Sequence, residues 1–178
     1  MYFLSVLYLF LPAGLANMAP PFAAMLFPKA NYPLDFRLKF RGHRLFGDHK
    51  TFRGLFSGIV LGLLSIYLQK YLDRFYFFNS LSLIDYSRIS PLFGFSLGLG
   101  ALMGDAVKSL FKRQIGVKPG HTWFPWDQID WIIGSAIFAI PFIEVTLNLA
   151  ITYLLVGLLA HLISKVIGFF LRINDTAF

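Results

Sequence analysis

The stretch GDAVKSLFKRQIGVKPGHTWFPWDQID, residues 104–130, lies between two apolar runs, PLFGFSLGLGALM (91–103) and WIIGSAIFAI (131–140). It contains three carboxylates, four cationic side chains and one histidine, in a chain of which only 14% of the residues are charged. Charged side chains are costly inside a bilayer and normally face the interior of a helix bundle or a wet cavity. The stretch therefore predicts two membrane helices joined by a polar loop in which the chemistry of the protein is concentrated.

The composition of the whole chain agrees with a membrane protein. Of its 178 residues 57% are hydrophobic, whereas soluble domains are about 45–50% apolar and about 25% charged. The absence of cysteine excludes disulfides, thiolate metal sites and a cysteine nucleophile. The net charge of +7 lies in loops, which does not favour a nucleic-acid partner. We therefore expect residues 1–178 to form a single all-α integral membrane domain.

The apolar residues form blocks of a length suited to membrane helices, which need roughly 20 residues each. We expect about five transmembrane helices, in segments 1–25, 54–70, 91–111, 128–144 and 146–171. The first has no basic n-region or cleavage site and reads as a retained helix rather than a signal peptide. We expect it to be interrupted by Pro12 and by the sequence ANMAPPF, which should kink or end it near Asn17 to Pro21. Pro141 either ends the fourth helix or kinks it.

Glycines recur at steps of four in the second and third segments. They are Gly54, Gly58 and Gly62, then Gly94 and Gly98, and then Gly100 and Gly104. This spacing places glycine along one helix face and allows neighbouring helices to approach closely. The alternative is that glycine is simply common in membrane helices.

The distribution of Lys and Arg predicts the orientation. Cations are frequent between the first two segments and between the third and fourth, and the hairpin near residues 141–148 has none. The positive-inside rule then places these two basic loops in the cytoplasm, the N-terminus outside and the C-terminus inside. Both loops are therefore expected at the same membrane face.

The acidic residues of the quoted stretch are candidate metal ligands. Asp105 and Lys112 share a helix face with Ser109, and Asp127 and Asp130 share one side of the next helix. Three carboxylates at adjacent helix ends suit Mg²⁺, which binds oxygen ligands and bridges to phosphates. The cations of this rim and its histidine are suited to a polyanion: Lys112, Arg113, Lys118 and His121. A rim that only binds lipid headgroups is the alternative, and helix capping alone accounts for one of the acids.

The first basic loop ends in a second set of candidate phosphate ligands directly before the second helix. They are Gly47, Asp48, Lys50, Thr51, Arg53 and Gly54. Exposed amides or the Thr51 hydroxyl at a helix start can donate to phosphate, although the glycine-rich preamble of a P-loop is missing. Asn17, in the break of the first segment, is either a nucleotide contact or a buried helix-to-helix hydrogen bond.

These motifs, taken in order, resemble the CDP-archaeol synthases of archaea, relatives of the phosphatidate cytidylyltransferases. The matching residues are Gly104-Asp105, Ser109, Lys112-Arg113, Gly116, Lys118-Pro119-Gly120, Asp127-Gln128 and Asp130, with Asn17 in LANMAPP and residues 47–54 as GDHKTFRG. The resemblance covers nearly the whole chain. It fails in the last segment, where the family places asparagine shortly after histidine and this chain has Ser164 and Lys165 after His161.

The resemblance implies Mg²⁺-dependent transfer of CMP from CTP to 2,3-bis-O-geranylgeranylglycerol 1-phosphate, which yields CDP-archaeol and pyrophosphate. It implies an active site on the cytoplasmic side of the cell membrane, with Asp105, Asp127 and Asp130 as metal ligands and Lys112 and Arg113 as catalytic cations. CTP and its phosphates would contact Asn17, Asp48, Lys50, Thr51, Arg53, Gly54, Ser109, Lys118 and His121. The isoprenoid tails would lie in an apolar groove between glycine-lined helices, and a homodimer is one option.

Other classes of function remain open at this point. A transporter or channel, or a lipid-phosphate-binding scaffold without chemistry, would also be a basic helical membrane protein. Charge gathered at one rim and the lack of a visible repeat argue against transport. A lipid phosphatase is a third option, although no nucleophile with an adjacent base is evident.

Overall fold

The computed structural model describes residues 1–118 and 121–170, and side chains up to residue 164. The secondary structure of the described chain is helical, as expected, apart from one short hairpin in the first basic loop. Its helices are α1 (Tyr2–Leu9), α2 (Leu11–Leu26), α3 (Phe52–Leu72), α4 (Tyr76–Asn79), α5 (Leu92–Gln114), α6 (Trp126–Ala139) and α7 (Leu147–Phe170), and its strands are β1 (Lys39–Phe40) and β2 (His43–Arg44). The last four long helices match the predicted segments, and α6 ends before Pro141 rather than continuing through it.

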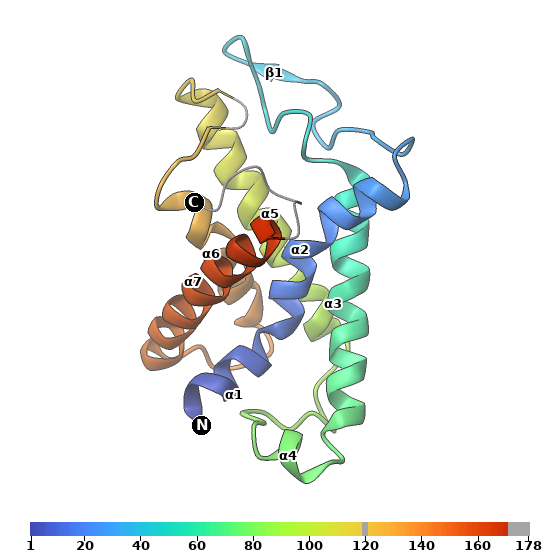
Figure 1. Ribbon diagram of the computed structural model, residues 1–178, viewed down its shortest axis with the longest axis vertical. Coiled ribbons are helices and arrows are strands. Elements are labelled where there is room, and N and C mark those ends of the chain that lie inside the picture. The colour runs from blue at the N-terminus through green and yellow to red at the C-terminus, as the bar shows by residue number, and fades with distance from the viewer. Residues whose placement is uncertain (119–120, 171–178) are drawn as a thin grey trace.

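Helix α5 is the centre of the bundle. It packs against α2, α3 and α6, while α7 packs against α1 and α6 on the far side. Figure 1 shows α3 along one side of the molecule and α6 and α7 along the other. Aromatic contacts join the outer helices, since Tyr153 of α7 stacks on Phe10 with ring centroids 3.6 Å apart and meets Trp131 of α6 edge-on.

The glycine ladders bring the helices of the bundle into backbone contact, as predicted from their spacing. A Cβ on Gly62 of α3 would lie 2.4 Å from the carbonyl oxygen of Gly94 in α5. On the opposite face of α5, a Cβ on Gly104 would lie 2.2 Å from the carbonyl oxygen of Asp130 in α6. Because only hydrogen fits in these gaps, the polar last turns of α5 lie directly against the first turn of α6.

The first segment breaks at one of the two interruptions expected from its sequence, the one at Pro12. The two helices α1 and α2 meet at Phe10 with a bend of 51°, just before Pro12. The prediction that the segment ends near Pro20 and Pro21 is wrong, because α2 continues through both prolines to Leu26. Proline is tolerated inside a membrane helix when neighbouring groups satisfy the backbone carbonyls that it frees. The carbonyl of Ala16, whose helical donor would be residue 20, lies against Gly58 of α3.

Two helices of the described residues, Phe52–Leu72 and the part of α7 up to Ser164, are long and apolar enough to cross a membrane. There are three such spans if the bent pair α1 and α2 counts as one. Helix α5 carries Asp105 and Lys108 within its length, and α6 has only 14 residues. Five membrane crossings therefore stay a prediction.

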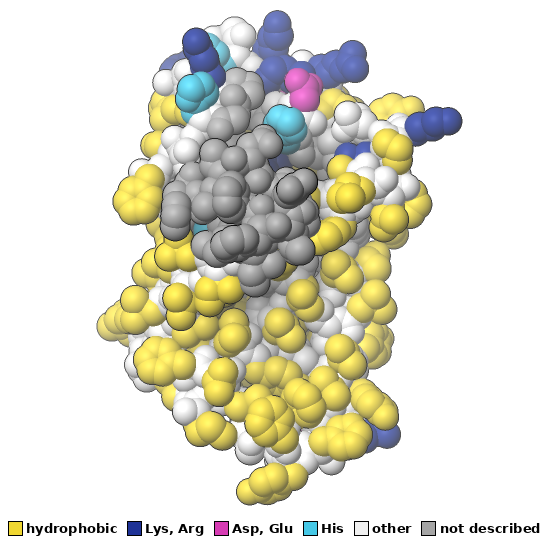
Figure 2. Space-filling model, viewed as in Figure 1, with side chains coloured by type: hydrophobic (Ala, Val, Ile, Leu, Met, Phe, Trp, Pro, Cys, Tyr) yellow, Lys and Arg dark blue, Asp and Glu magenta, His cyan; other side chains and the backbone are white. Residues whose placement is uncertain are grey.

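The two basic loops meet at one end of the molecule, as expected from their composition. The loop between α2 and α3 carries the β1–β2 hairpin and lies over the last turns of α5 (Figure 1). Figure 2 shows lysine, arginine and histidine gathered at this end, while hydrophobic side chains cover most of the remaining visible face. This distribution matches a protein whose apolar part lies in lipid and whose charged end lies at the surface.

Candidate functional site

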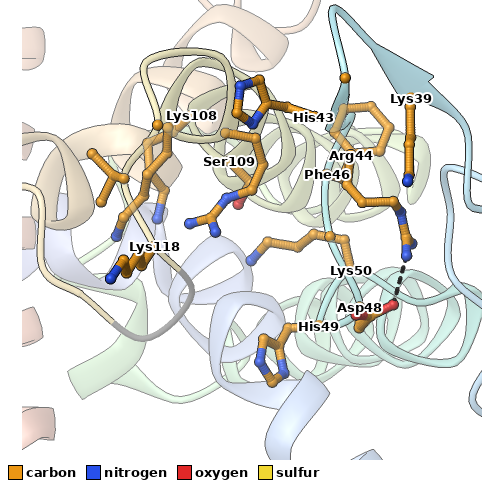
Figure 3. A pocket seen from close by; sticks show the side chains of 16 residues that line it. Lys39, His43, Arg44, Phe46, Asp48, His49, Lys50, Lys108, Ser109 and Lys118 are labelled. Carbon is orange, nitrogen blue, oxygen red and sulfur yellow. Dashed lines mark hydrogen bonds and ion pairs between the residues drawn. The ribbon is translucent and has the colours of Figure 1, made fainter.

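A polar cavity of about 600 Å³ opens between the first basic loop and the end of α5. Figure 3 shows its walls: Lys108 and Lys118 lie on one side, Lys39 and Arg44 on the other, and Lys50 extends between them. The cationic side chains among its lining residues are Lys39, Arg44, Lys50, Lys108, Lys112, Arg113 and Lys118. A cavity of this size with so many cations is suited to a ligand that carries several negative charges.

The three predicted metal ligands converge on one lysine at the base of this cavity. The Lys108 Nζ lies 3.1 Å from Asp105 Oδ1, 2.8 Å from Asp127 Oδ1 and 2.9 Å from Asp130 Oδ2. All four side chains are at most 19% exposed. Because Asp105 is on α5 and the other two aspartates are on α6, their convergence depends on the glycine contact between these helices.

Two further lysines each form an ion pair with one of these aspartates, whereas Asp130 has no second lysine partner among the described residues. Lys50 from the first basic loop donates to Asp105 Oδ2. The Lys112 Nζ lies 2.9 Å from Asp127 Oδ2, which also accepts a hydrogen bond from the amide of Trp123. Asp130 has only Lys108 as a cationic partner among the described residues, together with the amide of Trp131. The cluster therefore pairs three carboxylates with three ammonium groups.

The loop that covers the cavity is organised by Asp35. Its buried carboxylate accepts hydrogen bonds from the Arg44 guanidinium at 2.7 and 3.1 Å and from the amides of Arg37, Phe46 and Gly47. Burial disfavours the charged form of Asp35, but these hydrogen bonds outweigh it and lower the pKa of the carboxyl group to about 2. The result is a rigid turn that leads directly to Lys50.

An apolar groove of about 530 Å³ runs between α5 and α6 on the other side of Lys108. Its lining is almost entirely hydrophobic and includes Val107, Phe111, Trp126 and Ile137. Its polar lining consists of Lys108 and Asp130 among the described residues. The groove therefore leads from a surface suited to lipid up to the charged cluster.

Most of the predicted site residues of α5 and of the first loop line the cavity or contact its charged cluster. Asp48, Lys50, Ser109, Lys112, Arg113 and Lys118 line the polar cavity. The side chain of Asp48 is 77% exposed and pairs with Arg44 at 2.8 Å, drawn as the dashed line in Figure 3. Asp105 and Asp127 bind the lysines of the cavity, and Asp130 lines the groove.

Five predicted residues have other positions. The buried Thr51 hydroxyl caps α3 by accepting from the amide of Gly54, and Gly54 packs against Pro20. Arg53 donates to the carbonyl of Phe27 at 2.6 Å. These three residues build the start of α3 and do not line the cavity. Asn17 is half-buried on α2 and His121 is exposed, and neither lines the cavity or the groove.

The sequence analysis did not include Lys108, Arg44 or Asp35 among the site residues. Lys108 stands three residues after Asp105, a spacing at which helical side chains meet, so a signal was present. Asp35 is an isolated acid in a strongly basic loop, which was an available signal for a structural ion pair. Arg44 was not distinguishable from the neighbouring cations, because its role depends on the fold of the loop.

The donor chemistry of the cluster fits a hard divalent cation. Among the described residues no three His, Cys, Asp or Glu side chains are arranged to hold a metal ion as they stand. The carboxylate oxygens instead surround the Lys108 ammonium group at hydrogen-bond distance. Ligands of Mg²⁺ lie closer to their centre, at roughly 2.0–2.1 Å. Mg²⁺ commonly takes one or two carboxylates and completes its shell with phosphates and water, which is the type of ligand that these aspartates offer.

This chain is similar to proteins described as CDP-archaeol synthases and to a solved enzyme of archaeal lipid biosynthesis. A CarS-like family model, described as CDP-archaeol synthase, matches residues 1–178. The CDP-archaeol synthase of Methanosarcina mazei is 35% identical over 92% of this chain and 97% of its own, and that of Methanocaldococcus jannaschii is 32% identical over 95% and 93%. A solved structure described as an intramembrane enzyme for archaeal membrane lipids biosynthesis aligns with a TM-score of 0.71 and 26% identity, covering 90% of this chain and 92% of that one.

Proposed function

Because the chain belongs to the CDP-archaeol synthase family, we propose that its polar cavity binds CTP and that its apolar groove admits the phosphate of an archaeal ether lipid. The enzyme is a CTP-dependent cytidylyltransferase that acts on a lipid phosphate. One observation carries the assignment of sites: a cation-rich cavity and an apolar groove share Lys108, whose ammonium group lies within 3.1 Å of an oxygen from each of the three aspartates. The nucleotide can therefore reach this cluster from the aqueous side, and the lipid can reach it from the bilayer.

The reaction joins two phosphates and needs no covalent intermediate on the protein. A non-bridging oxygen of the lipid phosphate forms a bond to the α-phosphorus of CTP. The bond from that phosphorus to the oxygen bridging it to the β-phosphate breaks, and pyrophosphate leaves with the electron pair. The products are the CDP-lipid and pyrophosphate. Catalysis of this kind consists mainly of positioning and charge neutralisation.

The cations of the cavity supply both the positioning of the phosphates and the neutralisation of their charge. Lys50 from the loop and Lys112 and Arg113 from α5 surround the volume in which the triphosphate would lie. Their charge lowers the repulsion between two anions that must come within bonding distance. Lys118, Arg44 and Lys39 at the outer wall would hold the distal phosphates and pyrophosphate as it leaves.

Asp105, Asp127 and Asp130 are the residues that would hold Mg²⁺, with Asp130 as the principal ligand. Asp105 and Asp127 each keep a second lysine partner, whereas Asp130 has Lys108 alone among the described cations. When bound, the ion supplies charge stabilisation at the attacking and leaving oxygens. Mg²⁺ dependence is tested by removing the ion with EDTA and then adding Mg²⁺ back.

The lipid we propose is 2,3-bis-O-geranylgeranylglycerol 1-phosphate, whose branched apolar chains suit the groove between α5 and α6. The α5–α6 contact through Gly104 and Gly134 forms part of the floor of this groove. We further propose a multi-pass protein of the cell membrane with the cavity on the cytoplasmic side. A homodimer stays an option, and the mass of the protein in detergent or nanodiscs would test it.

Activity is tested with purified protein, Mg²⁺, the ether-lipid phosphate and CTP labelled in the α-phosphate. We expect the label in a CDP-lipid, with release of pyrophosphate, and a clear preference for CTP over ATP, GTP and UTP. A diacylglycerol phosphate serves as the comparison lipid. No product above a protein-free control would contradict the proposed function and favour a transporter or a binding scaffold.

The role of the carboxylates is tested with Asp130→Asn. This change keeps the shape of the side chain but removes its charge, and we expect kcat to fall on the order of 100-fold or more. The fold should persist because Lys108 retains Asp105 and Asp127. Asp85→Asn, at an exposed carboxylate paired with Arg88, is the matched control and should keep full activity. Full activity of Asp130→Asn would refute the metal role.

A further inference from the structure

Lys108 belongs to both cavities of the molecule. It lines the polar cavity together with Lys50 and Lys112, and it lines the apolar groove together with Asp130. No other described residue appears in the lining of both. Its ammonium group therefore lies at the passage from the groove to the nucleotide cavity, where the reacting phosphates of the proposed function must meet.

The Lys108 ammonium group also occupies the point at which the three carboxylates converge. Its Nζ lies within 3.1 Å of an oxygen from each of the three aspartates. The flexible four-carbon stem of a lysine allows such a charge to be relocated. A divalent cation that binds these carboxylates repels an ammonium group a few ångström away. The carboxylates and Lys108 therefore cannot keep their present contacts when such an ion is bound.

The lining of the groove indicates where the displaced ammonium group of Lys108 would go. Lys108 is the only cation among the described residues that line it, and its neighbour there, Asp130, is negative. An anionic headgroup that arrives through the groove meets no other positive charge before the cluster. The polar cavity, in contrast, already has several other cations for the nucleotide.

From these observations we infer that Lys108 has a different partner in each of two states. Before substrates bind, its ammonium group pairs with the three aspartates. Once a divalent cation takes its place among them, the ammonium group contacts the lipid phosphate. The inference rests on the proposed function and adds a residue and an order of events to it. Lys108 keeps the carboxylates close together in the resting enzyme. Its release then couples metal binding to capture of the lipid phosphate.

The experiment compares Lys108→Met, which removes the charge, with Lys108→Arg, which keeps it. Lys29→Met, at an exposed lysine outside both cavities, is the control for the same substitution. The first readout is binding of Mn²⁺ alone, followed by the loss of its free electron paramagnetic resonance signal. We expect Lys108→Met to bind Mn²⁺ at least about 10-fold more tightly than wild type, because no ammonium group has to be displaced. Unchanged or weaker Mn²⁺ binding would overturn the inference.

The second readout separates the two substrates in steady-state kinetics. For Lys108→Met we expect KM for the lipid phosphate to rise roughly 10- to 100-fold, as for the loss of a charged hydrogen bond, with KM for CTP within about 3-fold. Lys108→Arg should restore most of the lipid affinity. An equal rise in both KM values would overturn the inference while leaving the proposed function intact. A wild-type enzyme that forms no CDP-lipid would instead refute the function itself.

Lys108→Met leaves three carboxylates with two ammonium partners and therefore has to be checked for folding. Thermal unfolding in detergent is measured with and without Mn²⁺. We expect a lower Tm without the ion and a larger stabilisation by Mn²⁺ than in wild type. If Lys108→Met is misfolded, Lys108→Gln provides the same two readouts with a polar side chain, and the same outcomes decide.

Discussion

Asp35 is the residue through which the first basic loop is positioned over the cavity. Its carboxylate ties Arg44 and the amides of Phe46 and Gly47 into one turn. That turn ends at Lys50, which reaches across to Asp105 of α5. A buried acid in the loop thus helps to position Lys50, the lysine that we propose binds a phosphate of the nucleotide.

Asp35→Asn is expected to loosen this turn, since a neutral amide cannot replace the charged acceptor of Arg44. The loss of hydrogen bonds to a charged group costs about 1.5–3 kcal/mol of local stability. We expect faster hydrogen exchange at the amides of Phe46 and Gly47 and a higher KM for CTP, with KM for the lipid phosphate nearly unchanged. Asp85→Asn, at the opposite end of the molecule, is the control. Unaltered protection of both amides would contradict the role of Asp35.

The same residue predicts a dependence on pH. The pKa of Asp35 falls from 3.8 to about 2 in the folded protein, so its stabilising contribution is complete above about pH 4. Protonation removes the contribution as the pH falls from about 4 through about 2, the folded pKa. Proteolysis of the loop at residues 35–48 by an acid-active protease, corrected for the pH dependence of the protease on an unfolded substrate, should increase more steeply over this interval in wild type than in Asp35→Asn. Equal pH profiles would count against the hydrogen-bonded carboxylate.

At the scale of the elements, the contact between α5 and α6 assembles the site. Gly104 lies against the backbone of Asp130, and Gly134 lies against Gly100 and Gly104. This close approach places the last turns of α5 beside the first turn of α6, and the three aspartates converge as a result. Glycine spacing predicted that helices approach closely, but it did not identify which helices do so.

Gly104→Ala is expected to separate these helices, because the new Cβ would lie 2.2 Å from a backbone carbonyl oxygen. Overpacking of this kind typically costs about 1–3 kcal/mol, and Tm in detergent should fall together with activity. Gly14→Ala is a matched control in another helix, since its nearest neighbour would be a Trp131 ring carbon at 4.0 Å. A Gly104→Ala protein with the stability and activity of the Gly14→Ala protein would refute the importance of the contact.

At the scale of the whole molecule, charge is segregated to one end. The loop between α2 and α3 and the last turns of α5 carry most of the described cations, and the loop between α3 and α5 lies at the opposite end (Figures 1 and 2). The excess of Lys and Arg predicts that the cavity faces the cytoplasm. CTP and Mg²⁺ are then available on the side where the cavity opens.

This orientation is testable because the chain contains no cysteine. Lys29→Cys and Arg88→Cys place one thiol each at an exposed position at either end of the bundle. In intact cells a membrane-impermeant maleimide should label only the Arg88→Cys protein, and after permeabilisation it should label both. Labelling of only Lys29→Cys in intact cells would show the reverse orientation. Labelling of both in intact cells would show that the two ends are not on opposite sides.

The sequence by itself determined the helical class, the apolar segments after the first, the basic loops and the aspartates of the charged cluster, because these depend on hydrophobicity, local spacing and motifs within single segments. Only the tertiary structure decided that α2 continues through Pro20 and Pro21, that Thr51 and Arg53 build a helix start rather than the cavity, and that Lys108 lies between the three acids. Each of these depends on groups distant in sequence, such as the Gly58 backbone against Ala16 or the carboxylates of α6 beside α5. The sequence determines which chemical groups a segment carries, whereas the packing of the helices determines the partner of each buried polar group.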